Sequence, residues 1–293
     1  MLVSMAAWCA DGDVFTAKTV EGVTMTFKVT SEANKECQVG DDEPNSASVA
    51  KSTAGAVTIP SNVNGYSVKS LGNKAFFECS NITTLIIPNS ITWIGQYVFS
   101  GCTSLKEIEF PPSLKTIDRY GCYNSGVEKI VLPDGMTSIG NSAFRSCSNL
   151  QSVKIGKGTV TFGKNVFRDC SALSAITFDG TICRFNGEDA FRSCNSLISV
   201  TITDLGAWCK SWFYTVSSTP LYYANNLLLL KGNETAEIKN VVIPNDVTEI
   251  SSYLFSGCNS LESVTIGDGV TSIGEYNQGI KGVTNVEIIP VSA

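Results

Sequence analysis

Apolar residues recur along this chain with a period of about 23 residues. All copies but one place an aromatic residue three positions before a small one, as in Phe99 with Cys102 and Phe144 with Cys147. The aromatic position recurs at spacings of 23, 23, 22, 23, 24 and 64, and it is filled by Phe76, Phe99, Cys122, Phe144, Phe167, Phe191 and Phe255. Regular spacing of this kind predicts a stack of similar units in which each copy adds one turn.

A short strand is predicted within each copy. Leu105, Ile108 and Phe110 are followed by Pro111, and the last two apolar residues flank a polar one, as in a half-buried strand. A mostly glycine position comes later in each copy, as at Gly140, where a Cβ would hinder a bend. Because a unit of this size cannot bury its apolar side alone, the copies must stack and their strands must join in a parallel sheet. We expect a repeat solenoid that is right-handed and curved, with short parallel strands.

The repeat is similar to the BspA-like class of leucine-rich repeats. The shared phrase is I-G-x-x-A-F-x-x-C-x-x-L-x-x-[IV]-x-I-P, and the match covers about Val57 to Gly274. Such proteins occur in gut and oral anaerobic bacteria. The resemblance implies export, a surface location and binding to host or neighbouring-cell proteins such as extracellular-matrix components. It implies no enzymatic activity, and it carries over no ligand residues because the family has no shared binding motif.

The ends of the repeat divide the chain into four parts. Val23, Met25, Phe27 and Val29 alternate as a strand that would face the first rung, and the last residues lose the aromatic and cysteine positions. Because solenoid ends need atypical units that cover the core, both regions are interpreted as caps. The expected parts are a signal-like remnant over 1–10, an N-terminal β cap over 11–56, the solenoid over 57–275, and a degenerate C-terminal cap over 276–293.

The first ten residues, MLVSMAAWCA, resemble the apolar second half of a secretory signal. Two interpretations remain open, since the stretch is either a truncated signal or simply an apolar N-terminus. The first interpretation agrees with the export implied by the family resemblance, and we expect a secreted or cell-surface location. No later apolar run approaches the roughly 20 residues that a membrane-spanning helix needs.

The period is interrupted over 203–240. Asp204 is positioned to cap a short helix over Leu205–Phe213. Gly232 and Asn233 form a predicted hairpin turn between Leu227–Leu230 and Ile238–Ile243. The insert is also rich in aromatic residues. They either fill the core of an irregular rung or form an exposed platform for a protein or sugar partner, and the candidates for that platform are Trp208, Trp212, Tyr214, Tyr222 and Tyr223.

Composition excludes several kinds of chemistry. The 293 residues contain no histidine, which removes Ser-His-Asp and Cys-His catalysis and histidine-ligated zinc. The net charge of −6 argues against a surface that tracks nucleic-acid phosphates. Six of the eleven cysteines occupy one repeat position, where they are expected to form a ladder of small buried free thiols. We therefore expect no metal and no cofactor.

A second candidate surface follows from the strand pattern. The residue between the two core positions of each strand must face outward, and these residues are Ile86, Glu109, Val131, Lys154, Thr177, Thr201, Val242 and Thr265. If the strands line the concave face, this row is its central stripe. The row is mixed and partly apolar, which suits protein contact better than nucleic acid.

These features favour a non-enzymatic binding protein, secreted or attached to the cell surface, with a protein partner such as a host extracellular-matrix or cell-surface protein. Two alternatives remain: a structural spacer without a ligand of its own, and carbohydrate binding through the aromatic insert. Catalysis by paired carboxylates is disfavoured, because the repeat places Asp and Glu singly and irregularly.

Overall fold

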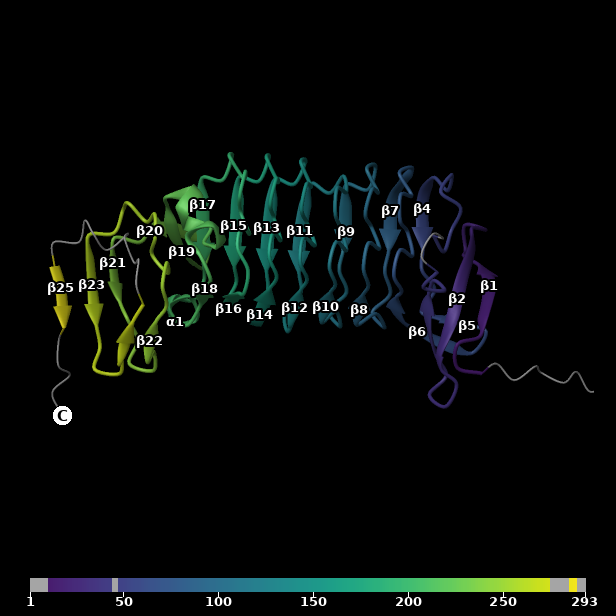
Figure 1. Ribbon diagram of the computed structural model, residues 1–293, viewed down its shortest axis with the longest axis horizontal. Coiled ribbons are helices and arrows are strands. Elements are labelled where there is room, and N and C mark those ends of the chain that lie inside the picture. The colour runs from purple at the N-terminus through teal and green to yellow at the C-terminus, as the bar shows by residue number, and fades with distance from the viewer. Residues whose placement is uncertain (1–9, 44–46, 275–284, 289–293) are drawn as a thin grey trace, which may run out of the picture.

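Two ladders of short parallel strands build a long β-solenoid with about 23 residues in each turn (Figure 1). The computed structural model describes residues 10–43, 47–274 and 285–288. Sheet B is the ladder that the sequence pattern predicts, and its strands, in chain order, are β4 (Gly55–Thr58), β7 (Ile82–Ile86), β9 (Glu107–Glu109), β11 (Lys129–Leu132), β13 (Ser152–Ile155), β15 (Ala175–Phe178), β17 (Ser199–Ile202), β19 (Leu227–Lys231) and β20 (Glu234–Glu237).

Sheet A is a second ladder, which forms where each turn passes the apolar residue before the glycine position. Its strands after the N-terminal region are β5 (Asn62–Val63), β6 (Tyr66–Leu71), β8 (Trp93–Ile94), β10 (Thr116–Ile117), β12 (Ser138–Ile139), β14 (Gly158–Phe162), β16 (Thr181–Phe185) and β18 (Trp212–Phe213). The sequence pattern did not predict this second sheet, because most of its strands are only two residues long.

The N-terminal region extends sheet A. Strand β2 (Thr24–Ser31) pairs antiparallel with both β1 (Val14–Lys18) and β3 (Glu36–Val39), and β3 pairs in parallel with β6. Met25, Phe27 and Val29 on β2 are buried, which confirms that this strand alternates as predicted.

Beyond the insert the ladder restarts in two smaller sheets. Sheet C contains β21 (Asn240–Val242), β23 (Ser263–Ile266) and β25 (Asn285–Ile288), and sheet D contains β22 (Glu249–Ile250) and β24 (Ser272–Ile273). Strand β25 pairs in parallel with β23 and so adds one more rung to sheet C. The rest of the predicted C-terminal cap lies outside the described residues, as does nearly all of the signal-like stretch.

The insert contains the predicted helix, but in a shorter form. Helix α1 spans Leu205–Cys209, and the Asp204 carboxylate accepts a hydrogen bond from the Ala207 N–H at 3.0 Å. The expected extension to Phe213 is wrong, because Trp212 and Phe213 form β18 and pair with Arg184 and Phe185. A 3-10 turn (Val216–Ser218) and helix α2 (Leu221–Ala224) follow before the chain enters β19.

The predicted hairpin turn is confirmed at Gly232 and Asn233, but its second strand was placed too late. Strand β19 pairs with β20 (Glu234–Glu237) and not with Ile238–Ile243. The Ile238 N–H still donates to the Leu227 carbonyl, at 2.9 Å, and this bond ends the antiparallel ladder. The chain then resumes the repeat, so the following residues form β21 and pair in parallel with β23.

The core between the sheets is built from repeated layers. Stacked phenylalanines run along the solenoid axis: the Phe144 and Phe167 ring centroids are 5.5 Å apart, as are those of Phe167 and Phe191. All three rings are fully buried. Gly140, at the glycine position, has a negative φ, so it is not needed there for a left-handed backbone. It instead permits two successive turns to approach closely, because a Cβ on Gly140 would lie 2.4 Å from the Arg119 backbone nitrogen. The repeat thus fixes how closely successive turns can stack.

Candidate functional site

The outward row on sheet B is confirmed as a continuous structural feature. Glu109, Val131, Lys154, Thr177 and Thr201 are direct neighbours on β9, β11, β13, β15 and β17. Each lies between two buried positions of its strand or at the strand end, and each is exposed or half-exposed. After the insert, Val242 and Thr265 continue the same register on sheet C.

Several positions of this row expose apolar side chains that the fold does not require. Ile86 is 54% exposed and Val131 is 44% exposed, and Val242 is also exposed. In the uninterrupted ladder, these side chains lie among threonines and single charges.

The charges of this face balance one another. Strands β9, β11 and β13, with the residue before each, carry three lysines and three glutamates: Lys106, Lys129, Lys154, Glu107, Glu109 and Glu128. Lys106 lies 3.0 Å from Glu128 on the next turn, and Lys154 lies 2.8 Å from Asp179. The Lys154 ammonium and the Thr203 hydroxyl lower the pKa of the Asp179 carboxyl. The charges of the face therefore nearly cancel, and the face offers no positive field for a polyanion.

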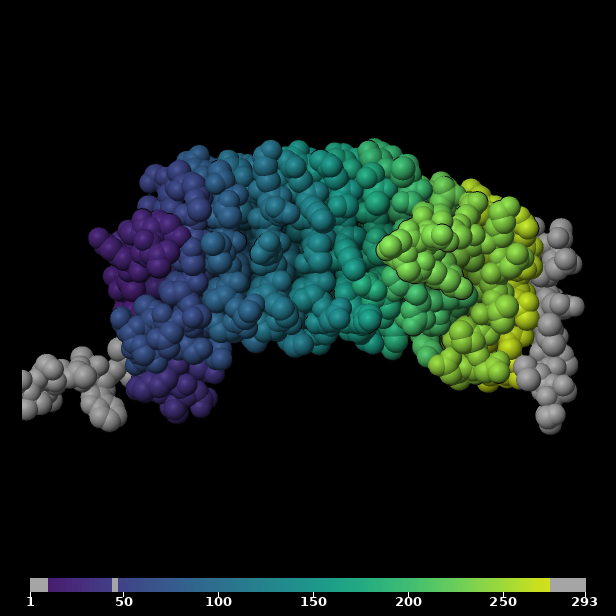
Figure 2. Space-filling view, turned by 180° about the vertical axis from the view of Figure 1, so that it is seen from behind, coloured from purple at the N-terminus to yellow at the C-terminus, as the bar shows by residue number. Residues whose placement is uncertain are grey.

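The row does not line the concave edge of the solenoid. Figure 1 shows the strands of sheet B running from the upper edge toward the lower edge, and Figure 2 shows that the lower edge is the hollowed one. Because strand side chains stand perpendicular to the sheet, those of the row point out of a flank. The short strands of sheet A lie along the lower, hollowed edge (Figure 1).

The expectation that Trp208 belongs to an exposed platform is wrong. Its side chain is only 1% exposed, and its ring packs against Phe178 at 5.6 Å and Phe213 at 5.4 Å. Helix α1 places the indole between the layers, where it fills the core of the irregular turn. The alternative interpretation of the insert, that its rings complete the core, therefore holds for Trp208.

The other insert rings form two separate pairs. Trp212 is partly exposed and lies 6.0 Å from the exposed Tyr214, with the rings tilted by 56°. Tyr222 is exposed on α2 and meets Tyr223 edge to face at 5.1 Å. Tyr223 is half-buried and packs against the core, so it is a packing residue more than a contact residue, and its burial raises its pKa to about 12. The rings of neither pair are coplanar, so they do not make one flat platform.

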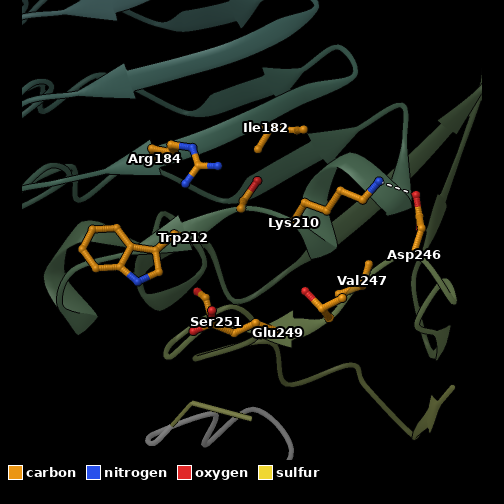
Figure 3. A pocket seen from close by; sticks show the side chains of 10 residues that line it. Ile182, Arg184, Lys210, Trp212, Asp246, Val247, Glu249 and Ser251 are labelled. Atoms are coloured by element: carbon orange, nitrogen blue, oxygen red, sulfur yellow. Dashed lines mark hydrogen bonds and ion pairs between the residues drawn. The ribbon is translucent and has the colours of Figure 1, made fainter. Parts of the chain in front are cut away.

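A cavity that sequence reasoning missed lies where the ladder is interrupted. It has a volume of about 350 Å³ and lies between β16 and β18 on one side and β22 on the other (Figure 3). Lys210 and Asp246 form an ion pair at 2.5 Å at one side of the cavity. The loss of the repeat period over 203–240 was the sequence signal for this irregular region. It did not show that the missing strand would belong to sheet A.

The cysteine ladder is confirmed as a buried feature, with a bonding pattern that the sequence did not reveal. All cysteines of the described residues are buried and free. The Cys170 thiol donates to the Phe144 carbonyl at 3.1 Å, and the Cys194 thiol donates to the Phe167 carbonyl at 3.1 Å. These two thiols thus each bond to a carbonyl of the preceding turn. Burial raises the pKa of the Cys102 and Cys194 thiols to about 12, which makes them poor nucleophiles.

The native thiols should react slowly with a chromogenic disulfide reagent at neutral pH. For Cys37, burial raises the pKa from 9.0 to about 11, which lowers the thiolate fraction about a hundredfold. We expect labelling at least about a hundredfold slower than in denaturant, measured by absorbance on a Cys9→Ser variant because Cys9 lies outside the described residues. Rapid labelling of most thiols in the native protein would contradict the ladder.

No group of three or more His, Cys, Asp or Glu side chains within the described residues is arranged to hold a metal ion. Among the same residues, no helix has both the length and the apolar character that crossing a bilayer requires.

Comparison with known proteins agrees with this geometry. The model of the BspA type leucine rich repeat region matches residues 69–198, 115–229 and 233–288. A search of curated proteins gave no match. Similar solved structures include the pneumococcal vaccine antigen PcpA, with 18% identity, a TM-score of 0.53 and coverage of 96% of this chain and 71% of that one.

Two further solved structures are similar to this chain. The leucine rich repeat protein of T. pallidum has 22% identity, a TM-score of 0.44 and coverage of 89% of this chain and 88% of that one. A leucine rich cell surface protein of Faecalibacterium prausnitzii has 16% identity, a TM-score of 0.32 and coverage of 95% of each chain. At these identities the likeness concerns the fold alone.

Proposed function

Since the chain belongs to the BspA-type leucine-rich repeat family, we propose that it is a non-enzymatic, exported binding protein. In this proposal it presents the outward row of sheet B to a protein partner at the cell surface or in the extracellular matrix. The observation that carries the proposal is the exposure of Ile86 and Val131 in a regular, charge-balanced strand ladder. Exposed apolar groups among polar neighbours are a feature of protein contact surfaces.

The rigidity of the ladder supports the same role. The neighbouring strands of sheet B from β7 to β17 are hydrogen-bonded in register, and their inward side chains are buried in the core. A surface held in this way loses little conformational entropy when a partner binds. Leucine-rich repeats suit protein binding because their stacked turns make an extended surface.

Export is compatible with the free thiols. Oxidising compartments favour disulfides, and a protein with many free cysteines would be vulnerable there. Here burial withholds the thiols of the described residues from oxidants, and it raises the pKa of Cys79 to about 11, which suppresses the reactive thiolate. The apolar stretch over 1–10 supports the same location.

A binding measurement with matched variants tests the proposal. The purified chain is passed over a panel of immobilised extracellular-matrix and cell-surface proteins, and affinity for any retained partner is measured by surface plasmon resonance. Val131→Lys with Thr177→Lys alters the row, whereas Thr116→Lys with Thr161→Lys alters outward positions of sheet A. We expect the first pair to weaken binding at least about tenfold and the second to leave it unchanged.

Either of two results would reject the role of the row. One is the absence of any retained partner across the panel for the intact chain. The other is equal affinity of the two double variants, which would favour a spacer function, particularly if shortening the solenoid alone had a phenotype.

A further inference from the structure

The interruption of the solenoid removes one strand from sheet A. From β7 to β18, each turn contributes a strand to sheet B and then one to sheet A. After β19 the chain instead reverses through Gly232 and Asn233 into β20. The turn that begins at β19 therefore has no strand of its own in sheet A, and β18 and β22 fall in separate sheets.

The cavity of about 350 Å³ lies at this break. Roughly 300–1,000 Å³ is the usual range for small-molecule sites, so the volume suits one small ring better than a long chain. Figure 3 shows the side chains that surround it, and the lining residues are Ile182, Arg184, Lys210, Ser211, Trp212, Asp246, Val247, Thr248, Glu249 and Ser251.

The outward row of sheets A and D changes character at the cavity. From β6 to β24 the described residues of this row are Ser70, Trp93, Thr116, Ser138, Thr161, Arg184, Trp212, Glu249 and Ser272. Within this span the only charged members are Arg184 and Glu249, which line the cavity from β16 and β22.

These two charged groups are available to a ligand. Neither side chain has an ion pair or a hydrogen bond with a described residue, and both are exposed. By contrast, Lys210 and Asp246 neutralise one another. The hydrogen bond from the Lys210 ammonium lowers the pKa of the Asp246 carboxyl. The cavity therefore has balanced charge, with one free group that only donates and one that only accepts hydrogen bonds.

An aromatic ring completes the lining. The Trp212 indole is partly exposed at the cavity, beside Tyr214. Indole faces provide a large apolar contact area at small entropic cost. A ligand that fits this lining needs one apolar face for the ring and a polar rim for Arg184 and Glu249.

We propose that this cavity binds a neutral saccharide, with one pyranose ring against Trp212 and its hydroxyls directed to Arg184 on one wall and Glu249 on the other. A sugar ring has an apolar C–H face, and its hydroxyls both donate and accept hydrogen bonds, which matches the free groups on the two walls. The balanced charge disfavours acidic or sulfated glycans, and the polar lining disfavours lipids. The proposal is independent of the protein-binding row, which lies on sheet B.

A glycan array tests the proposal, with the intact chain as the sample and immobilised neutral, amino, uronic and sulfated sugars as probes. We expect retention on neutral glycans, followed by titration calorimetry with the retained glycan. Trp212→Ala and Glu249→Gln should each weaken binding about tenfold or more, and Trp212→Phe should restore part of it. Tyr222→Ala, an exposed ring on α2 outside the cavity, is the matched control and should leave the affinity unchanged.

The outcomes are decisive in both directions. Glu249→Gln replaces an exposed side chain with one of the same size, so we expect no change in the melting temperature. Weaker glycan binding by this variant at an unchanged melting temperature supports the site. Retention only on acidic glycans, retention on none, or equal binding by Trp212→Ala and the unaltered chain overturns it. The Glu249→Gln variant is also tested for binding to a matrix protein. If it still binds that protein, the sheet B row is intact, and a failure of saccharide binding concerns the cavity alone.

Discussion

Replacing Phe144 with alanine should lower the free energy of unfolding by about 3–5 kcal/mol. The ring is fully buried and stacks on Phe167, and the position before it in the ladder is filled by Cys122 and not by another ring. The variant therefore removes a large apolar side chain where one neighbouring layer is already small. Equilibrium denaturation followed by circular dichroism measures the effect.

Phe77→Ala is the matched control, because Phe77 is the next residue after a ladder ring but is only half-buried. It should cost less than half as much as the Phe144 change. Repeat proteins can unfold one group of turns at a time. The unfolding of each variant is therefore followed by two spectroscopic probes, and the free energies are compared only if the two probes give coincident transitions. Equal destabilisation by the two variants would show that the ring ladder is not the main source of stability.

Gly140→Ala is expected to destabilise the solenoid by about 1–3 kcal/mol or more. The added Cβ would lie 2.4 Å from the Arg119 nitrogen and 2.6 Å from the Asp118 carbonyl carbon. Both atoms belong to the backbone of the preceding turn, so no side chain can move to relieve the contact. Two turns would have to separate, and their hydrogen bond from the Gly140 N–H to the Ile117 carbonyl, 2.8 Å long, would be strained.

The chain itself offers a control for this change. Asp118 occupies the same repeat position one turn earlier and already carries a Cβ, so Asp118→Ala adds no bulk. It removes only the local hydrogen bond that the Asp118 carboxylate accepts from the Arg119 N–H. We expect a change well under that of Gly140→Ala, measured by thermal melting. A Gly140→Ala protein that melts with the unaltered chain would refute the close-approach argument.

The sequence located the sheet B row correctly for a physical reason. Ile108 and Ile130 are buried because alternate side chains of a strand point to opposite sides, and the same rule sends Glu109 and Val131 outward. Alternation is a property of each strand alone, so it can be predicted without a tertiary structure. The curvature of the solenoid depends on how the turns stack, and the sequence could not show that the row faces a flank.

The aromatic insert shows where local pattern fails. Trp208 and Trp212 are four residues apart, yet one is buried in the core and the other lines a surface cavity. A regular helix over both would have placed them on one side. Helix α1 ends at Cys209 because pairing with β16 draws Trp212 into a strand, and that pairing depends on a segment far back in the chain.

The sequence by itself determined the repeat, its period, the inward residues of each turn and the absence of histidine chemistry. Those features follow from composition and from spacing along one strand or one turn. Only the tertiary structure decided which insert rings are exposed, how closely Gly140 approaches the preceding turn, and where a strand is missing beside Arg184 and Glu249. Each of these depends on how successive turns stack, and contacts between turns join residues that no local pattern relates.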